Sequence, residues 1–370
     1  MRRGFGVRGS AFFGSAVLLL AAPVFGQGRV SNAKAETRSA AAGLEREVQA
    51  VAARGGITWI GYRAPMVAGQ RQMCCYDSIS DTGTFGAGMC RLESGSGVSM
   101  NTGDIRDRNG TRITLEPATE FLVLARLETG AVSRIRTFTP DCDVDAGGLP
   151  VVWLTDVKPD DSVAWLTSLV AASPDNGERH DRVGKTALTA VALHNTPAAD
   201  RALENFVASS RPEWLRGDTA FWLGSTRGEP GARLLARMIA QDPSDKVRDK
   251  VTFGLSVSKQ PLALTTLIAA ARDDKSAKVR GQALFWLAQR AGREALATIS
   301  GAIDNDPEIE VKKKAVFALS QLPKDEGVPK LIELARTNRS PEVRKQAMFW
   351  LGQSRDPRAV QFFEDVLLKK

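Results

Sequence analysis

The sequence beyond about residue 180 is dominated by a repeat of 32 residues. An apolar residue, a basic residue, a phenylalanine and a leucine each recur at this interval. These four columns are Leu215, Val247, Val279, Val311 and Val343; Arg216, Arg248, Arg280, Lys312 and Arg344; Phe221, Phe253, Phe285, Phe317 and Phe349; and Leu223, Leu255, Leu287, Leu319 and Leu351. A unit of this length holds two helices and cannot bury its apolar faces alone, so the repeat predicts a solenoid of stacked helix pairs.

Each repeat has the periodicity of two antiparallel helices. In one first helix, Val279, Ala283, Trp286 and Leu287 follow the i, i+4, i+7, i+8 spacing of a single buried face. Five copies are clear. A sixth, degenerate copy begins near Asp181, and terminal repeats are expected to be atypical because they cap the stack.

The repeat resembles the HEAT repeat family, including the phycobilisome-lyase-like bacterial HEAT repeats. The resemblance is carried by Asp-Pro, then Val-Arg, then Ala and Leu-Gly, as in Asp242-Pro243 with Val247-Arg248 and in Pro341–Gly352. The block Gln346–Ser354 also resembles exported bacterial HEAT-repeat proteins of unassigned role. The resemblance covers about half of the chain. It is specific for the fold and carries little information about function, because this family serves many roles.

The N-terminus has the pattern of a secretory signal. Arg2, Arg3 and Arg8 precede the apolar run Ala11–Ala22, and small residues precede a cleavage site before Gln27. We therefore expect residues 1–26 to be a signal peptide of a periplasmic or secreted protein. The run is shorter than a membrane span, so no transmembrane domain is expected after cleavage. An uncleaved N-terminal anchor and a twin-arginine signal are the alternatives.

All four cysteines, Cys74, Cys75, Cys90 and Cys142, lie in the N-terminal half. An even number in an oxidising compartment predicts two disulfides. Adjacent cysteines cannot easily bridge each other, so Cys74 and Cys75 are expected to pair separately with Cys90 and Cys142, in an order that the sequence leaves open. One disulfide with two buried thiols is the alternative.

The fold class predicted is multidomain α+β, with a small β-rich domain ahead of an α–α superhelix. The expected parts are an N-terminal helical segment, 30–55, with its helix over Ala33–Ala53; a β-rich disulfide-containing domain, 56–158; a capping helix and linker, 159–180; and the solenoid, 181–370. The strand candidates are 57–62, 112–116, 120–126, 132–138 and 151–154, with a hairpin turn at 128–130. A long loop is expected from Ser78 to Arg108. The capping helix is expected to begin at Pro159-Asp160-Asp161 with an aspartate as its N-cap.

The charge is concentrated on the solenoid. The formal net charge is +8, and residues 181–370 carry 31 basic against 23 acidic side chains. A basic solenoid could bind nucleic acid, but export excludes nucleic acid as the expected ligand. Acidic protein surfaces, anionic envelope polymers and lipid surfaces stay open as partners.

Two columns of the repeat have competing interpretations. The basic column and the column Asp242, Asp274, Asp306 and Asn338 are expected to cap helix starts and tie neighbouring repeats together, the alternative being an anion-binding ladder. The phenylalanine column is accompanied in alternate repeats by Trp222, Trp286 and Trp350, with Gly254 and Ala318 between them. This large–small alternation favours packing between repeats, and the alternative is an exposed aromatic stripe that anchors a partner.

The sequence gives little support for a catalytic or metal-binding site. Asp141–Gly147 resembles a calcium loop superficially, but its Gly is misplaced and Val152 stands where the bidentate Glu belongs, so a disulfide-tethered turn is favoured. The two histidines, His180 and His194, are expected on polar helix ends, and no hydrolase or metalloprotease motif occurs. HEAT-like iron-dependent hydroxylases use paired His-Glu motifs, and none exists here. No catalytic residue, metal or cofactor is therefore predicted.

These patterns together predict a non-enzymatic scaffold of the bacterial cell envelope that binds protein partners through its solenoid. One alternative is an enzyme or regulator whose site lies in the cysteine-containing N-terminal domain. The other is a binder of anionic envelope polymers or lipid surfaces.

Overall fold

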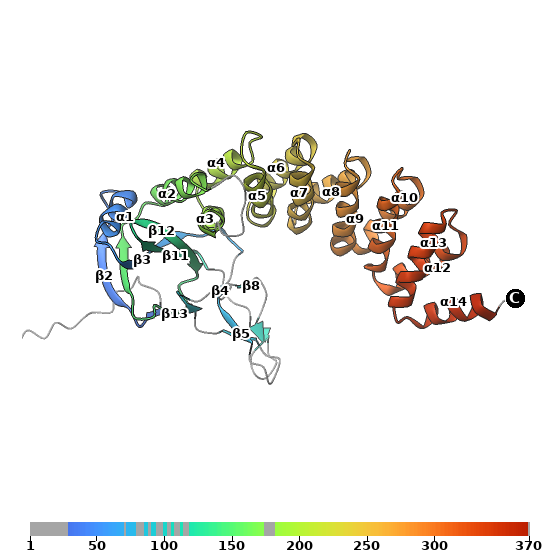
Figure 1. Cartoon of the computed structure of the whole chain (residues 1–370), viewed down its shortest axis with the longest axis horizontal. Coiled ribbons are helices and arrows are strands. Elements are labelled where there is room, and N and C mark those ends of the chain that lie inside the picture. The colour runs from blue at the N-terminus through green and yellow to red at the C-terminus, as the bar shows by residue number, and fades with distance from the viewer. Residues whose placement is uncertain are drawn as a thin grey trace, which may run out of the picture.

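The structure, a computed structural model, describes residues 29–69, 72–78, 85–87, 90–93, 99–101, 105–106, 112–113, 118–173 and 182–368. The predicted signal peptide, His180 and most of the predicted linker lie outside these ranges. The chain forms an arch, with a sheet domain at one end and a helical array that curves away from it to the C-terminus (Figure 1).

The N-terminal domain is built on a five-stranded sheet in the order β12-β11-β3-β14-β2. Its strands are β2 (Lys34–Ser39), β3 (Ile57–Pro65), β11 (Glu120–Glu128), β12 (Ala131–Phe138) and β14 (Pro150–Thr155). β11 is antiparallel to both β3 and β12, whereas β14 is parallel to β3 and β2. The predicted hairpin is confirmed, because Thr129 and Gly130 join β11 to β12 with φ of 51° and 82°.

Shorter strands complete the domain. β1 (Arg29–Ser31), β13 (Asp143–Asp145) and β7 (Cys90–Arg91) form a parallel three-stranded sheet. The strand pairs are β4 (Gln72–Cys74) with β8 (Ser99–Asn101), β5 (Tyr76–Ser78) with β6 (Phe85–Ala87), and β9 (Ile105–Arg106) with β10 (Arg112–Ile113). The predicted long loop therefore contains short strands where it is described. Of the predicted strand 112–116, only β10 is described.

The predicted helix over Ala33–Ala53 was wrong in its first half. Residues 34–39 form the edge strand β2, and α1 (Leu44–Ala52) begins only after Gly43, whose φ is 117°. Pairing with β14 overrides the helical propensity of this Ala- and Glu-rich stretch. The second half is confirmed, because Leu44, Val48 and Val51 are buried on one face of α1.

The sheet is covered on both faces. Ile60, Tyr62 and Phe121 point into a core shared with α1 and α2 (Pro159–Ala171). Trp59, Leu122 and Leu124 point into a second core with all four cysteines, listed below with the disulfides. This double coverage explains why β11 reads as a nearly continuous apolar run rather than as an alternating strand.

The capping helix α2 is present, but its N-cap differs from the prediction. Lys158 occupies the N-cap position without a side-chain hydrogen bond, and Pro159 is the first helical residue. Asp160 and Asp161 lie in the first turn, where their negative charges interact favourably with the positive end of the helix dipole.

The solenoid comprises six helix pairs within residues 182–368. The first helices of the pairs are α3 (Arg182–Leu193), α5 (Glu213–Thr226), α7 (Asp245–Val257), α9 (Ala277–Ala291), α11 (Ile309–Ser320) and α13 (Pro341–Gln353). The second helices are α4 (Pro197–Phe206), α6 (Gly228–Gln241), α8 (Pro261–Asp273), α10 (Leu296–Asn305), α12 (Lys324–Thr337) and α14 (Pro357–Leu368). The predicted six-repeat solenoid is confirmed. None of the described helices has both the length and the apolar content to cross a membrane.

The sheet domain and the solenoid are joined by backbone hydrogen bonds. The segment after β3 pairs with the turn after α3: Val67 N donates to Leu193 O at 2.9 Å, and Asn195 N donates to Pro65 O at 3.0 Å. The core of the sheet's helical face continues without interruption into the solenoid. The N-terminal domain therefore covers the first repeat and caps the stack.

Candidate functional site

The phenylalanine column and its tryptophans form a continuous line of rings along the solenoid, which we call the aromatic ladder. Its members are Phe221, Trp222, Phe253, Phe285, Trp286, Phe317, Phe349 and Trp350. The rings touch in the order Trp222, Phe221, Phe253, Trp286, Phe285, Phe317, Trp350 and Phe349, and each lies within 5.8 Å, centroid to centroid, of the next ring in this order. The column is missing from the first repeat, where Thr189 occupies the equivalent position.

Two kinds of contact alternate along the ladder. Phe221 stacks on Phe253 at 5.5 Å with 12° between the ring planes, and the next repeat brings Trp286 to 4.7 Å from Phe253. Trp286 and Trp350 thus each pack against the phenylalanine of the preceding repeat. The space beside Gly254 is filled instead by the backbone of Ala220 and the side chain of Leu235. Within the described chain, the buried indole N–H groups of Trp286 and Trp350 make no hydrogen bond, so packing alone holds these rings.

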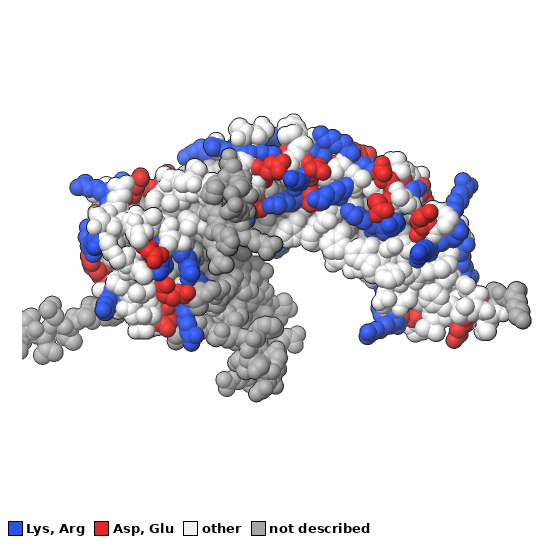
Figure 2. All heavy atoms as spheres, in the orientation of Figure 1, with Lys and Arg blue, Asp and Glu red and all other residues white. Residues whose placement is uncertain are grey.

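The first helices line the inner side of the arch. They pack tightly, since a Cβ at Gly224 would collide with the carbonyl oxygen of Gly254 on the next first helix. The second helices leave open grooves between them, of about 630 Å³ between α4 and α6, 550 Å³ between α6 and α8 and 440 Å³ between α8 and α10. A stack that is tight in one layer and open in the other curves toward the tight layer. The inner edge of the arch also carries few charged residues, whereas its outer side is densely charged (Figure 2).

The ladder remains in contact with solvent despite its packing. Phe253 is 36% exposed and Phe349 is 53% exposed. Phe285 and Phe317 are partly buried, and they stack on each other at 5.8 Å with 4° between planes. On a helix of 100° per residue, each Phe lies opposite the core-facing Val, Ala and Leu positions, so the ring edges point away from the second helices. Packing and exposure therefore coexist in this column.

Two rows of polar side chains flank the ladder. Three residues before each Phe stand Asp218, Lys250, Gln282, Lys314 and Gln346 in successive repeats. Four residues after the Phe of the last three repeats stand Gln289, Gln321 and Gln353, all exposed. Gln289 donates to Gln321 at 3.4 Å, so these carboxamides form a row parallel to the rings. We call the first set the lysine row and the second the glutamine row.

In three places the basic and acidic columns tie neighbouring repeats together, as predicted. Arg216 donates two hydrogen bonds to Asp242 of the next repeat, at 2.7 and 3.0 Å, and Asp242 also accepts from Ser244 N at 2.9 Å at the start of α7. Arg248 with Asp274, and Arg280 with Asp306, repeat this geometry. These three guanidinium groups are buried and already paired with carboxylates, so they are not free to bind an anion. Lys312 and Arg344 donate instead to the backbone carbonyls of Asp304 and Asn338.

The cysteines form two disulfides within the described chain, Cys74–Cys142 and Cys75–Cys90. This is the separate pairing that the adjacent cysteines predict, with the order now assigned. All four sulfurs lie in the buried layer beneath the sheet. None of these four cysteines therefore has a free thiol that could act as a nucleophile.

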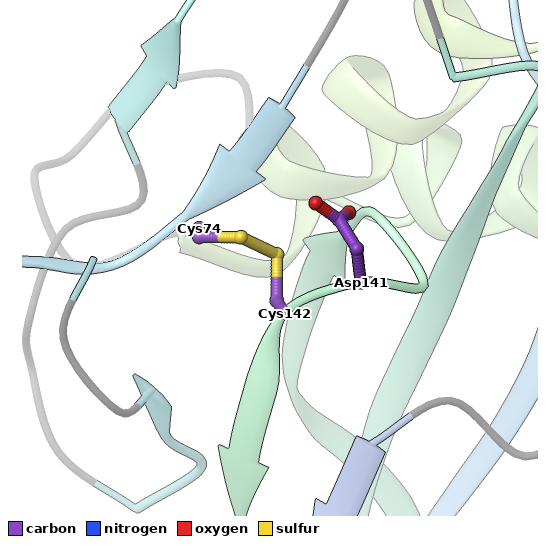
Figure 3. Close-up of side chains that lie close together, drawn as sticks. All are labelled: Cys74, Asp141 and Cys142. Carbon is purple, nitrogen blue, oxygen red and sulfur yellow. A yellow bond between two sulfur atoms is a disulfide. The ribbon is translucent and has the colours of Figure 1, made fainter. Parts of the chain in front are cut away.

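One group of three metal-type ligands occurs in the described chain: Cys74, Asp141 and Cys142 (Figure 3). The two sulfurs are bonded to each other, so they lack the thiolate charge that a metal ion requires. In the neighbouring turn, Asp145 accepts from Gly147 N at 2.8 Å and from Asn32 at 3.2 Å. The disulfide tether at Cys142 agrees with the prediction, but the predicted turn is wrong in its centre, because Asp143–Asp145 form the strand β13 between β1 and β7.

A buried hydrogen-bonded chain that the sequence did not reveal joins the sheet to the solenoid. Tyr62 Oη lies 2.8 Å from Ser162 Oγ, which lies 2.9 Å from His194 Nε2, and His194 Nδ1 lies 2.7 Å from Ala190 O. Nδ1 must donate to that carbonyl, so Nε2 accepts from Ser162 and Ser162 accepts from Tyr62. The three side chains are at most 1% exposed, so no substrate can reach this serine and histidine.

His194 differs from its predicted position on a polar helix end. It follows the last residue of α3, but it is fully buried and packs edge-on against Phe121 at 5.1 Å. Burial lowers the pKa of His194 to about 4, and the same burial raises the pKa of Tyr62. His194 is therefore neutral at pH 7 and serves as a structural connector.

Comparison with known proteins bears on the solenoid. A profile of HEAT repeats matches residues 264–346 and 297–370. No curated protein matches the chain. Among solved structures, the CpcE–CpcF complex of phycocyanin lyase from Nostoc sp. PCC7120 is 16% identical, over 42% of this chain and 97% of that one, with a TM-score of 0.33.

Two further solved structures are similar to a comparable degree. YibA of E. coli is 23% identical, over 50% of this chain and 68% of that one, with a TM-score of 0.34. Human deoxyhypusine hydroxylase is 15% identical, over 55% of this chain and 89% of that one, with a TM-score of 0.24. These likenesses carry no argument about function. The profile match shows that residues 264–370 consist of HEAT repeats, and the helix pairs before them continue the same stack.

Proposed function

We propose that this protein is a non-enzymatic binding scaffold of the bacterial cell envelope, and that it holds protein partners on the inner side of its solenoid. The observation that carries the proposal is the aromatic ladder. A line of eight rings, all of them at least partly exposed except the buried Trp222, lies on an otherwise sparsely charged face. Exposed contiguous aromatic surface is uncommon on monomeric proteins, and aromatic residues dominate the energetics of protein interfaces.

Other features support export and argue against an enzyme. Two disulfides are typical of proteins in an oxidising compartment. The N-terminus has the pattern of a secretory signal, which directs proteins to such a compartment. All four cysteines are used in these disulfides, and His194 is buried and neutral at pH 7. The candidate enzyme site in the N-terminal domain therefore has no observation in its favour within the described residues.

The test is affinity capture from a cell-envelope fraction, with partners quantified by mass spectrometry. We expect the triple variant Phe253→Ala/Phe285→Ala/Phe317→Ala to lose the partners that the wild type retains. Leu262→Ala is the matched control, because Leu262 is 39% exposed in the same repeat but lies on the second helix. Circular dichroism must show that the triple variant stays folded. Equal capture by a folded triple variant and by the wild type would refute the proposal.

A further inference from the structure

The solenoid fills the gap between the ends of two of its first helices with an arginine of its own. Arg227, the residue after α5, donates to the carbonyl oxygens of Ala192 and His194 at the end of α3, at 2.9 Å each. It also pairs with Asp200 on α4 at 2.7 Å. A cation is favoured at this place, because the C-terminal end of a helix is the negative end of its dipole.

Arg290 fills the next gap of this kind, between α7 and α9. It donates to Leu255 O at the end of α7, at 2.6 Å, and to Gln260 O just before α8, at 3.2 Å. Burial lowers the pKa of its guanidinium group, and no carboxylate of the described chain offsets this effect. Backbone carbonyl oxygens alone are therefore sufficient to hold a guanidinium group at this place in the stack.

The third gap of this kind, between α11 and α13, has no such arginine. Ser354 stands two repeats after Arg290, and Arg355 stands four repeats after Arg227. The backbone of Arg355 has φ of 51°, and its side chain is exposed. A cavity of about 160 Å³ lies here among the end of α11, the start of α12 and the end of α13 (Figure 1). One water molecule needs about 15 Å³ of such space, so the cavity can hold a group of several heavy atoms.

The cavity keeps the acceptors that Arg227 uses in the first gap. Ser320 and Leu322 line it, and they stand four repeats after Ala192 and His194. No residue of the described chain donates a hydrogen bond to the carbonyl oxygen of Ser320 or of Leu322. Leu322 is only 5% exposed, and a buried carbonyl group without a donor is unfavourable.

The acceptors equivalent to those of Arg290 are already used. Leu322 N donates to Leu319 O at 3.2 Å, and Arg358 donates to Lys324 O at 2.8 Å. Lys324 is the one charged residue in the lining, and its side chain is exposed, so solvent screens its charge. The position that stays open is therefore the one that the guanidinium group of Arg227 occupies in the first gap.

We propose that this cavity binds a guanidinium group from outside the chain, supplied either by an arginine side chain of a bound protein or by a free guanidino compound. The group donates to Ser320 O and Leu322 O, as Arg227 donates to the equivalent pair of oxygens. Its planar fork of N–H groups matches two carbonyl oxygens at once, whereas an ammonium group acts as a point charge. This inference does not depend on the aromatic ladder being a binding face.

The experiment follows the indole N–H signals of the full, ¹⁵N-labelled chain by nuclear magnetic resonance. The chain has seven tryptophans, of which Trp350 lines the cavity, and Trp350→Phe assigns its signal. Methylguanidinium is the probe and methylammonium is the comparison. We expect the Trp350 signal to shift saturably with methylguanidinium, with a Kd of about 1–10 mM. Methylammonium should bind at least about tenfold more weakly, because it cannot bridge both oxygens.

A variant that fills the cavity from within tests the location of the site. Ser354→Arg places an arginine at the position equivalent to Arg290, so it should abolish the shift of the Trp350 signal and raise the melting temperature. Ser256→Arg adds the same charge near the end of α7, away from the cavity, and should keep the binding. Arg355→Ala should also keep it.

The reverse change tests the comparison between the gaps. Arg290→Ser removes the donor to Leu255 O and Gln260 O and opens the gap between α7 and α9. Methylguanidinium should then shift the indole signal of Trp286, which it leaves unchanged in the wild type. It should also raise the melting temperature of this variant more than methylammonium does.

A capped tripeptide, acetyl-Gly-Arg-Gly-amide, separates the two sources of the guanidinium group. Binding of the tripeptide as tightly as methylguanidinium assigns the cavity to arginine side chains of proteins, and binding of methylguanidinium alone assigns it to free compounds. No saturable shift of the Trp350 signal, equal binding of methylammonium, or unchanged binding by Ser354→Arg would overturn the proposal. Binding that appears only in Arg355→Ala would overturn it too, since the chain's own arginine would then fill the cavity.

Discussion

His194 shows how a single side chain can link two domains at the cost of sensitivity to acid. Its two ring nitrogens are hydrogen-bonded as a neutral imidazole to Ser162 and Ala190. Protonation would place a charge in the core and would turn the accepting Nε2 into a donor facing Ser162. The link between β3, α2 and the end of α3 therefore exists only with the neutral ring.

The stability of the protein should fall in mild acid because of this residue. The ordinary pKa of 6.5 falls to about 4 in the fold, so the unfolded chain binds the proton first as pH drops. Stability is complete above about pH 6.5 and is lost as pH falls toward 4; between pH 7.5 and 4.5 we expect a loss of about 2–3 kcal/mol. Urea unfolding of the wild type and His194→Gln at both pH values measures it. The same pH dependence in both proteins would contradict this role.

The arginine–aspartate pairs stabilise the solenoid in their charged forms, whereas His194 stabilises the fold only in its neutral form. Arg248→Ala would leave the Asp274 carboxylate, which is 5% exposed, without its partner. We expect a loss of about 3–5 kcal/mol in the free energy of unfolding. Lys330→Ala removes a solvent-exposed pair with Glu333 and should cost less than about 1 kcal/mol. Urea denaturation measures the free energy of unfolding of both variants. Similar losses would show that the buried pair contributes no more to stability than the exposed pair.

At the scale of helices, the tight inner layer depends on glycine where adjacent first helices meet. Gly224 on α5 lies against the backbone of Gly254 on α7, whereas Gly352, at the equivalent place on α13, has nothing within 4 Å. Gly224→Ala should push α5 and α7 apart and destabilise the protein by about 1–3 kcal/mol.

The control for this prediction lies in the same column of the repeat. Gly352→Ala should be neutral or stabilise the protein by up to about 1 kcal/mol, because alanine lowers the entropy of the unfolded chain and favours helix. Thermal melts of both variants give the comparison. A Gly224→Ala protein as stable as Gly352→Ala would show that the close approach of the first helices is not required.

The elements differ in how far the sequence could predict them. The apolar spacing within a single repeat is a weak signal, but the same spacing recurs every 32 residues in six repeats. This recurrence is why the helix pairs were predicted together with their core residues. β2 has no such support. Its strand is defined by pairing with β14, more than a hundred residues away, and its composition favours helix. The Tyr62–Ser162–His194 chain is non-local in the same way, since three unrelated elements place it.

The disulfides belong to the same class of long-range feature, and their effect should depend on the loop that each closes. Cys74–Cys142 spans 68 residues and Cys75–Cys90 spans 15. In the chain-entropy account, their removal costs about 4 and about 3 kcal/mol respectively. The double replacements Cys74→Ala/Cys142→Ala and Cys75→Ala/Cys90→Ala, followed by unfolding of the β-rich domain through tryptophan fluorescence, measure the two losses. A larger loss for the shorter loop would contradict the entropic ranking.

At the scale of the whole molecule, the arch separates a densely charged outer side from an inner side with few charges (Figure 2). The aromatic ladder belongs to the first helices, which lie on the inner side. The sequence identified the aromatic column and posed packing and exposure as alternatives. It could not show that both apply, because the exposure of a ring depends on how neighbouring repeats curve. The curvature follows from the tight first-helix layer and the open grooves of the second-helix layer.

The central claim is that the inner side of the arch contacts a partner, and site-specific photocrosslinking in the intact cell envelope tests it most directly. Benzoylphenylalanine would replace Phe253 on the inner side or Leu262 on the outer side, two positions of similar exposure in one repeat. We predict a discrete crosslinked product from position 253 and none from position 262. A product from position 262 with none from position 253 would contradict the claim.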